Sequence, residues 1–268
     1  MLAWHEDFCT QLAERGYFVI RHDNRDIGRS THLDGVPTPS LVQLAVRDRR
    51  AAAYSLADMA ADSVGVLDHL GIDKAHIVGA SMGGMIAQTI AIRHPHRTLS
   101  LVSIMSNTGG RFMGQPAFTM YAVLLKPSPR DRDGFIQHGI DMFTKIGGSG
   151  YEPDIEDLRD IATRSYDRGH DPQGSQRQLA AIIADRDRTP GLRRLTIPAT
   201  VIHGSEDKLV RPSGGRTTAK AIPGARLLMI EGMGHGLPRG AWPQIIGAIA
   251  DTAARGEAAA AALTPVRG

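Results

Sequence analysis

The chain has 268 residues, a net charge of +3 and 42% hydrophobic, 22% charged and 5% aromatic residues, which excludes a disordered or fibrous class. The weak charge gives no case for a nucleic-acid partner, and no apolar run is long enough for a membrane span. One cysteine excludes an intramolecular disulfide framework and a Cys-rich metal site. The first residues lack the basic region of a secretory signal, so we expect a cytoplasmic enzyme or binding domain.

The predicted elements alternate between helices and short buried strands over residues 1–105. Trp4, Phe8 and Leu12 recur at helical spacing, and Gly16 is typical of the end of such a helix. The elements that follow are a strand over 17–20, a polar loop to about Pro39, a helix over 56–70, a strand over 75–79, a helix over 85–94 and a strand over 99–105.

This alternation stops between Ser106 and Gly191, a stretch that holds the glycine-rich run Gly147–Gly150 and many of the Phe and Met residues. We interpret it as a cap inserted into the core. The pattern then resumes with strands over 199–204 and 226–230 and a helix from about Trp242. Alternating strands and helices predict an α/β fold with a parallel sheet and helices on both faces. The expected parts are an N-terminal core part over 1–105, the cap over 106–191, a C-terminal core part over 192–252 and an Ala-rich tail over 253–268.

The segment Gly79-Ala80-Ser81-Met82-Gly83 matches the G-x-S-x-G pattern at a predicted strand-to-helix turn. This context is typical of a nucleophile elbow, in which a strained turn exposes the serine hydroxyl. We expect Gly79 and Gly83 to be required by close backbone contact, and the N–H of Met82 to stabilise an oxyanion at the helix N-terminus. The alternative is a glycine-rich turn with an incidental serine.

A serine nucleophile needs a base and an acid that orients the base, and in this fold they follow in the order acid, then histidine. Asp207 comes just after the predicted strand 199–204, and His235 just after the strand 226–230. Glu206 competes with Asp207 for the role of the acid, and the sequence favours Asp207 only modestly. The glycines beside His235 suggest a mobile loop that lets the ring reach Ser81.

The remaining candidates have simpler interpretations. His203 is expected to be structural, and His94-Pro95-His96 is expected to form a surface turn because no third metal ligand lies at a useful spacing. Arg186 and Arg188, with Asp185 and Asp187, are expected to form a solvated face. Neither nucleotide-binding motif, G-x-G-x-x-G or G-x-x-x-x-G-K-[ST], is present. We therefore expect no metal and no cofactor.

Together with the segment Asp23–Ser30, the segments around Ser81, Asp207 and His235 resemble the α/β-hydrolase superfamily, and in particular serine esterases of the aclacinomycin methylesterase type. The segment Asp23–Ser30 is similar to the family's D-x-R-G-x-G-x-S loop, with Asp26 in the usual glycine position. The resemblance implies that Ser81 is the nucleophile, Asp207 the acid and His235 the base. It also implies that the insertion forms a lid over an apolar substrate.

The resemblance departs from the family at the front of the chain. Family members have three strands before the first helix of this chain, and the third ends in a His-Gly turn that supplies a second oxyanion donor. We expect these strands to be missing here and Met1 to be an internal methionine of a longer protein. The strands over 17–20 and 75–79 would then lack the strand between them.

The favoured function is a serine hydrolase that cleaves a carboxylic ester of a small to medium apolar molecule through an acyl-enzyme on Ser81. The same three residues would also serve a cofactor-free perhydrolase of the haloperoxidase type or a C–C bond hydrolase. A third alternative, from another class, is an inactive or ligand-binding member of the fold.

Overall fold

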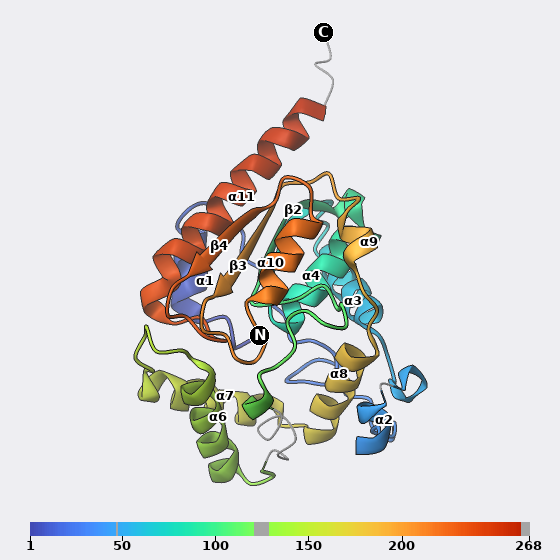
Figure 1. Cartoon of the computed structure of the whole chain (residues 1–268), viewed down its shortest axis with the longest axis vertical. Coiled ribbons are helices and arrows are strands. Elements are labelled where there is room, and N and C mark those ends of the chain that lie inside the picture. The colour runs from blue at the N-terminus through green and yellow to red at the C-terminus, as the bar shows by residue number, and fades with distance from the viewer. Residues whose placement is uncertain (47, 121–128, 264–268) are drawn as a thin grey trace.

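The computed structural model describes residues 1–46, 48–120 and 129–263. In this part of the chain the strands form one parallel sheet in the order β1-β2-β3-β4, with helices on both faces (Figure 1). The strands are β1 (Ala75–Ala80), β2 (Thr98–Ile104), β3 (Ala199–Gly204) and β4 (Arg226–Ile230). The helices are α1 (Glu6–Ala13), α2 (Leu41–Ala45), η1 (Arg49–Ala51), α3 (Leu56–His69), α4 (Met82–Arg93), η2 (Pro95–Arg97), α6 (Arg132–Ile146), α7 (Ile155–Gly169), α8 (Pro172–Ala184), α9 (Thr189–Leu192), α10 (Ser213–Ala221), η3 (Arg239–Ala241) and α11 (Trp242–Leu263).

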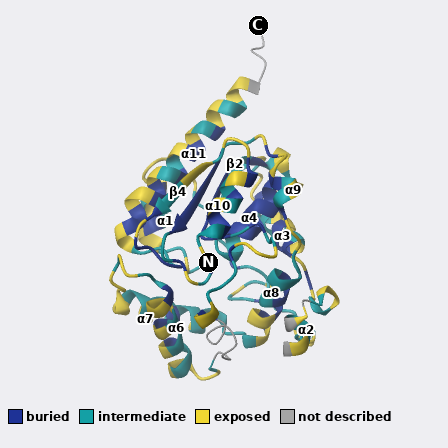
Figure 2. Ribbon diagram, in the orientation of Figure 1, coloured by how far each residue is buried: buried dark blue, intermediate teal, exposed yellow. Residues whose placement is uncertain are grey.

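The two central strands, β2 and β3, are apolar on both faces because helices cover both sides of the sheet. Successive side chains of a strand point to opposite faces. Val102 and Ile202 accordingly pack toward α1 and α11, whereas Leu101 and Val201 pack in the cluster on the opposite face, with α4 and α10. Figure 2 shows this central layer as the most deeply buried part of the molecule. The predicted fold class, a parallel sheet flanked by helices, is confirmed.

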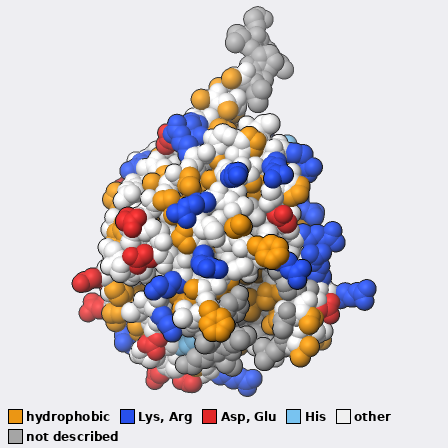
Figure 3. Space-filling view, viewed as in Figure 1, with side chains coloured by type: hydrophobic (Ala, Val, Ile, Leu, Met, Phe, Trp, Pro, Cys, Tyr) orange, Lys and Arg blue, Asp and Glu red, His pale blue; other side chains and the backbone are white. Residues whose placement is uncertain are grey.

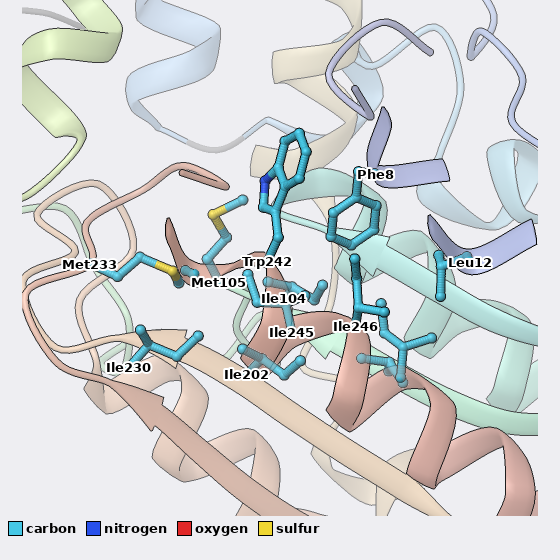
Figure 4. Close-up of a cluster of buried hydrophobic side chains, with 13 residues drawn as sticks. Phe8, Leu12, Ile104, Met105, Ile202, Ile230, Met233, Trp242, Ile245 and Ile246 are labelled. Carbon is cyan, nitrogen blue, oxygen red and sulfur yellow. The ribbon is translucent and has the colours of Figure 1, made fainter. Parts of the chain in front are cut away.

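The core on the α1 and α11 side is built around two aromatic rings (Figure 4). Phe8 of α1 meets Trp242 of α11 edge to face, with ring centroids 5.6 Å apart. Both rings are nearly inaccessible to solvent. This contact joins the first helix of the chain to the last and holds both against the sheet.

The predicted cap contains helices α6, α7 and α8. Helices α6 and α7 lie side by side at the lower end of the molecule in Figure 1, whereas α8 lies to their right and contacts η1. Helices α6 and α7 share a small apolar cluster of Ile136, Ile140 and Ala162. Residues 121–128 of the predicted cap lie outside the described residues. The division of the chain into core parts, cap and tail stays a prediction.

The expected strand over 17–20 is not formed among the described residues. Tyr17 and Val19 pack against the main core and Phe18 is 79% exposed, so the segment alternates like a strand. A strand also needs a neighbour that shares its backbone hydrogen bonds, and no described segment pairs with this one. The expectation that the first three strands of the family are missing stays a prediction.

Helix α11 extends to Leu263, so the described part of the predicted Ala-rich tail, from Ala253 onward, continues this helix. Alanine is the strongest helix former, and Ala253 is buried. Gly256 also approaches β2 so closely that an added Cβ would lie 2.8 Å from the carbonyl oxygen of Leu99. The last residues of the predicted tail, 264–268, lie outside the described part. Among the described residues, no helix has the length and apolar character that crossing a membrane requires.

Candidate active site

Ser81 lies at the junction of β1 and α4 in a strained backbone conformation. Its φ is 54° and its ψ is −121°, a region that residues with a side chain rarely adopt. The N–H of Ser81 donates to the carbonyl oxygen of Ile104, at 2.9 Å, which ties the turn to the end of β2. This is the geometry expected of a nucleophile elbow.

The close backbone contacts at this turn involve Gly79 and Gly84. A Cβ on Gly79 would collide with the carbonyl group of Gly83 and would lie 2.8 Å from the backbone nitrogen of Gly84. A Cβ on Gly84 would lie 2.7 Å from the Cβ of Ser106. The space around the Cα of Gly83 is open, so the expectation that Gly83 must be glycine for steric reasons is wrong.

Ser81, His235 and Asp207 meet at the carboxyl ends of three strands. Nε2 of His235 lies 2.8 Å from Oγ of Ser81, and Nδ1 of His235 lies 2.7 Å from Oδ2 of Asp207. Ser81 follows β1, Asp207 follows β3 and His235 follows β4. The parallel sheet thus brings together three residues that are far apart in the sequence.

Asp207 is held as a carboxylate in a buried position. Its Oδ1 accepts the N–H groups of Leu209 and Val210, at 2.9 and 2.8 Å. Burial raises its pKa, but hydrogen bonds from His203 and His235 outweigh burial, so the pKa of Asp207 lies below its ordinary value. An ionised Asp207 accepts the Nδ1–H of His235, which leaves Nε2 free to accept the proton of Ser81.

His203 supports the same carboxylate from the end of β3. Its Nε2 lies 2.7 Å from the carbonyl oxygen of Val210 and 3.4 Å from Oδ2 of Asp207, which requires the proton to be on Nε2. His203 is fully buried and does not contact Ser81 through any hydrogen bond among the described residues. This placement agrees with the expected structural role.

Glu206 points away from His235. Its carboxylate accepts the backbone N–H of Ser149 at 2.8 Å and the hydroxyl of Ser149 at 2.7 Å. Of the two adjacent acids, Asp207 is therefore the one that contacts the histidine. The sequence could not decide this, because the direction of each side chain depends on the turn that follows β3.

Met82 is the first residue of α4. The N–H groups in the first turn of a helix have no partner within the helix, and the helix dipole places partial positive charge there. The N–H of Met82, next to the hydroxyl of Ser81 in the chain, is therefore suited to bind a developing negative charge.

A second polar cluster joins the loop at Asp26 to α8, and sequence reasoning missed it. Ligand atoms of Asp26, His32 and Asp171 lie within 4.8 Å of one another, as a metal site would require. However, the guanidinium of Arg177 donates to Asp26 at 2.8 Å and to Asp171 at 3.4 Å. The arginine supplies the positive charge that these carboxylates need, so the cluster does not fit a metal ion. The one signal was Asp26, which has a φ of 65° where the family usually has glycine.

Arg188 does not belong to a solvated face, contrary to our expectation. It is 7% exposed and pairs with Asp185, and it donates to Gln88 at 3.1 Å and to the carbonyl oxygen of Asn107 at 2.7 Å. Burial lowers its pKa to about 9, so the guanidinium is charged at neutral pH. Arg186 is exposed, as expected.

The neighbouring surface is rich in arginine but lies apart from Ser81. A hollow of about 660 Å³ is lined by Arg49, Arg93, Arg186 and Arg194 among others, and by none of Ser81, Asp207 and His235. Figure 3 shows basic side chains gathered on this side of the molecule, where α3 and α9 lie. His94 and His96 remain at a surface turn, with ring centroids 6.3 Å apart.

The sequence and fold of this chain are similar to those of several known proteins. A family model described as alpha/beta hydrolase fold matches residues 1–238. Rhodomycin D methylesterase DnrP of Streptomyces peucetius is 27% identical over 258 residues, which cover 88% of this chain and 81% of DnrP. The 2-hydroxymuconate semialdehyde hydrolase of Pseudomonas putida is 30% identical over 223 residues, which cover 81% of this chain and 74% of that enzyme. The solved structure of an esterase from Exiguobacterium antarcticum has a TM-score of 0.70 at 20% identity, and the match covers 94% of this chain and 87% of that one.

Proposed function

The chain belongs to the alpha/beta hydrolase fold family and is an enzyme of that family, and from this premise we propose that it cleaves a carboxylic ester through an acyl-enzyme on Ser81. The observation that carries the proposal is the hydrogen-bonded row from Ser81 through His235 to Asp207, with distances of 2.8 and 2.7 Å. Such a row is what converts a weakly nucleophilic hydroxyl into a reactive one.

In the proposed reaction, Oγ of Ser81 attacks the ester carbonyl carbon while Nε2 of His235 takes the hydroxyl proton. Asp207 orients the imidazole and stabilises its positive charge. The N–H of Met82 binds the oxyanion of the tetrahedral intermediate. His235 then gives the proton to the leaving alcohol, and water attacks the acyl-enzyme by the same steps to release the acid.

The proposed substrate is a small-molecule ester with an apolar acid part. The insertion between 106 and 191 carries much of the Phe and Met content, which suits an apolar ligand. The similarity to an enzyme named rhodomycin D methylesterase favours a methyl ester within this class.

The test measures release of p-nitrophenol from p-nitrophenyl butyrate under pre-steady-state conditions. We expect a burst close to one equivalent per chain, lost in Ser81→Ala and retained in the control Ser63→Ala, whose hydroxyl lies in α3 and donates to Met59. Covalent labelling by a fluorophosphonate should follow the same pattern. A folded chain, checked by circular dichroism, that shows neither the burst nor the label would overturn the proposal that Ser81 forms an acyl-enzyme.

A C–C bond hydrolase is the second candidate. It is favoured by the relative named 2-hydroxymuconate semialdehyde hydrolase, whose substrate by its name contains no ester. Comparing kcat/KM for this compound with that for methyl and p-nitrophenyl esters separates the two functions. Higher efficiency on the semialdehyde would replace the esterase proposal.

A further inference from the structure

The turn Gly147–Gly150 of the insertion lies directly against the loop that carries His235. The N–H of His235 donates to the carbonyl oxygen of Ile146, and the N–H of Gly234 donates to that of Gly147, both at 2.7 Å. In the opposite direction, the N–H of Gly150 donates to the carbonyl oxygen of Gly232 at 2.9 Å. Three backbone hydrogen bonds therefore connect the insertion to the histidine loop.

These close contacts explain why both the turn over 147–150 and the His235 loop contain glycines. A Cβ on Gly148, which has a φ of +89°, would lie 2.5 Å from the nitrogen of Gly234. A Cβ on Gly150 would lie 2.7 Å from the Cα of Gly232. The glycines before His235 thus permit close contact between two backbones, and the idea that they form a mobile loop is not supported at Gly232 and Gly234.

Glu206, which follows β3, forms hydrogen bonds both to the turn over 147–150 and to the His235 loop. Its carboxylate accepts both the N–H and the hydroxyl of Ser149, and its own N–H donates to the carbonyl oxygen of Met233 at 3.0 Å. The hydrogen bonds from Ser149 lower the pKa of Glu206, so the carboxylate is ionised at neutral pH. Hydrogen bonds to an ionised group are about twice as strong as neutral ones. Glu206 therefore links the insertion, the Asp207 turn and the His235 loop.

We propose that Glu206 and Ser149 are positioning residues that hold the insertion against the His235 loop and so keep Nε2 of His235 within reach of Ser81. The inference rests on the proposed function, because it assigns His235 the role of the base. Its consequence is that the placement of the insertion controls the reactivity of Ser81. An error of about 1 Å in the placement of a catalytic group can cost about 100-fold in rate, which is enough to make this link measurable.

The kinetic test compares Glu206→Ala, Glu206→Gln and Ser149→Ala with the control Glu231→Ala on p-nitrophenyl butyrate. Glu231 is exposed and lies next to the same loop. We expect Glu206→Ala to lower kcat by about 10- to 100-fold with KM changed less than about twofold, since base placement and not substrate binding is altered. Glu206→Gln, which keeps one acceptor oxygen, should recover part of the loss. Ser149→Ala should fall between wild type and Glu206→Ala because it keeps the backbone N–H.

A second measurement does not depend on turnover. The proton between Nδ1 of His235 and Asp207 should give a downfield ¹H NMR resonance in the wild-type protein, which is absent in His235→Ala. We expect this resonance to shift or broaden in Glu206→Ala and to be unchanged in Glu231→Ala. An unchanged kcat and an unchanged resonance in Glu206→Ala would overturn the inference. A wild-type protein without ester hydrolysis but with the resonance sensitive to Glu206 would overturn the proposed function alone.

Discussion

The guanidinium of Arg177 in α8 donates two hydrogen bonds of 2.8 Å to the carboxylate of Asp26, 151 residues earlier in the chain. Both side chains are almost completely buried. A second ion pair, 2.6 Å long, joins Arg168 of α7 to Asp23, which belongs to the same loop as Asp26. Helices α7 and α8 are therefore attached to this loop through ion pairs, and the turn over 147–150 is attached to the His235 loop through backbone hydrogen bonds.

Removing the guanidinium should strongly destabilise the protein. In Arg177→Met the carboxylate of Asp26 would remain buried without its partner, which typically costs about 3–5 kcal/mol in the free energy of unfolding. The control is Arg132→Met, whose ion pair with Asp167 is exposed to solvent and should therefore contribute far less to the free energy of unfolding. Urea denaturation measures both. If both variants lost a similar free energy of unfolding, burial would not be what makes the ion pair of Arg177 important for stability.

The same pair predicts a pH dependence of stability. Burial raises the pKa of Asp26, but hydrogen bonds from Arg177 and Leu33 outweigh it and lower the pKa from 3.8 to about 2. Because the unfolded chain then binds the proton more readily, this contribution is present above about pH 4 and is lost as the pH falls toward 2. The contribution of the lowered pKa of Asp26 to the free energy of unfolding is about 2 kcal/mol.

The pH prediction is checked by denaturing the wild type and Asp26→Asn at several pH values. The stability difference between them should shrink by about 2 kcal/mol between pH 5 and pH 2. A difference that stays constant over this range would show that the pKa of Asp26 is not lowered by folding.

The glycines of the Ser81 turn should differ sharply in their tolerance of alanine. Gly79→Ala places a Cβ against the backbone of Gly83 and Gly84, where nothing flexible can move away, and should cost more than about 3 kcal/mol. Gly83→Ala adds a Cβ in open space within α4 and should be neutral or stabilising by up to about 1 kcal/mol. Thermal unfolding of the two variants measures this difference. Equal unfolding midpoints would show that Gly79 and Gly83 do not differ in their tolerance of a Cβ.

Arg188 and Arg186 form another matched pair. Arg188→Met should cost about 3 kcal/mol, because Asp185, Gln88 and the carbonyl oxygen of Asn107 would lose a charged donor. Arg186→Met should change stability by less than about 0.5 kcal/mol because its side chain is exposed. If Arg186→Met proved less stable to denaturant than Arg188→Met, the expectation that Arg188 lies on a solvated face would be supported.

Within the proposed mechanism, Asp207→Asn should lower kcat by about 10⁴-fold, because an amide favours the wrong tautomer of His235. Glu206→Gln should lose far less activity. Single-turnover measurements of acylation on p-nitrophenyl butyrate compare the two variants. A larger loss in Glu206→Gln than in Asp207→Asn would exchange the roles of the two acids.

The sequence alone identified the strand–turn–helix around Ser81 and the placement of Ser81, Asp207 and His235 just after three of the predicted strands. These features are readable because hydrophobic periodicity and glycine placement are local properties, and because strands of a parallel sheet end at a common edge. For the same reason the β1, β2, β3 and β4 strands were predicted to within a residue or two.

Only the tertiary structure decided what depends on a distant partner. The segment 17–20 has strand-like alternation but no neighbouring strand in the described part of the chain, and Arg188 is buried because Gln88 and Asn107 lie beside it. The two acids are told apart by their partners, because Asp207 contacts His235 whereas Glu206 binds Ser149, 57 residues away from it. Such pairings leave no periodic trace in the sequence, since a hydrogen bond between remote segments requires only that packing bring one donor and one acceptor together.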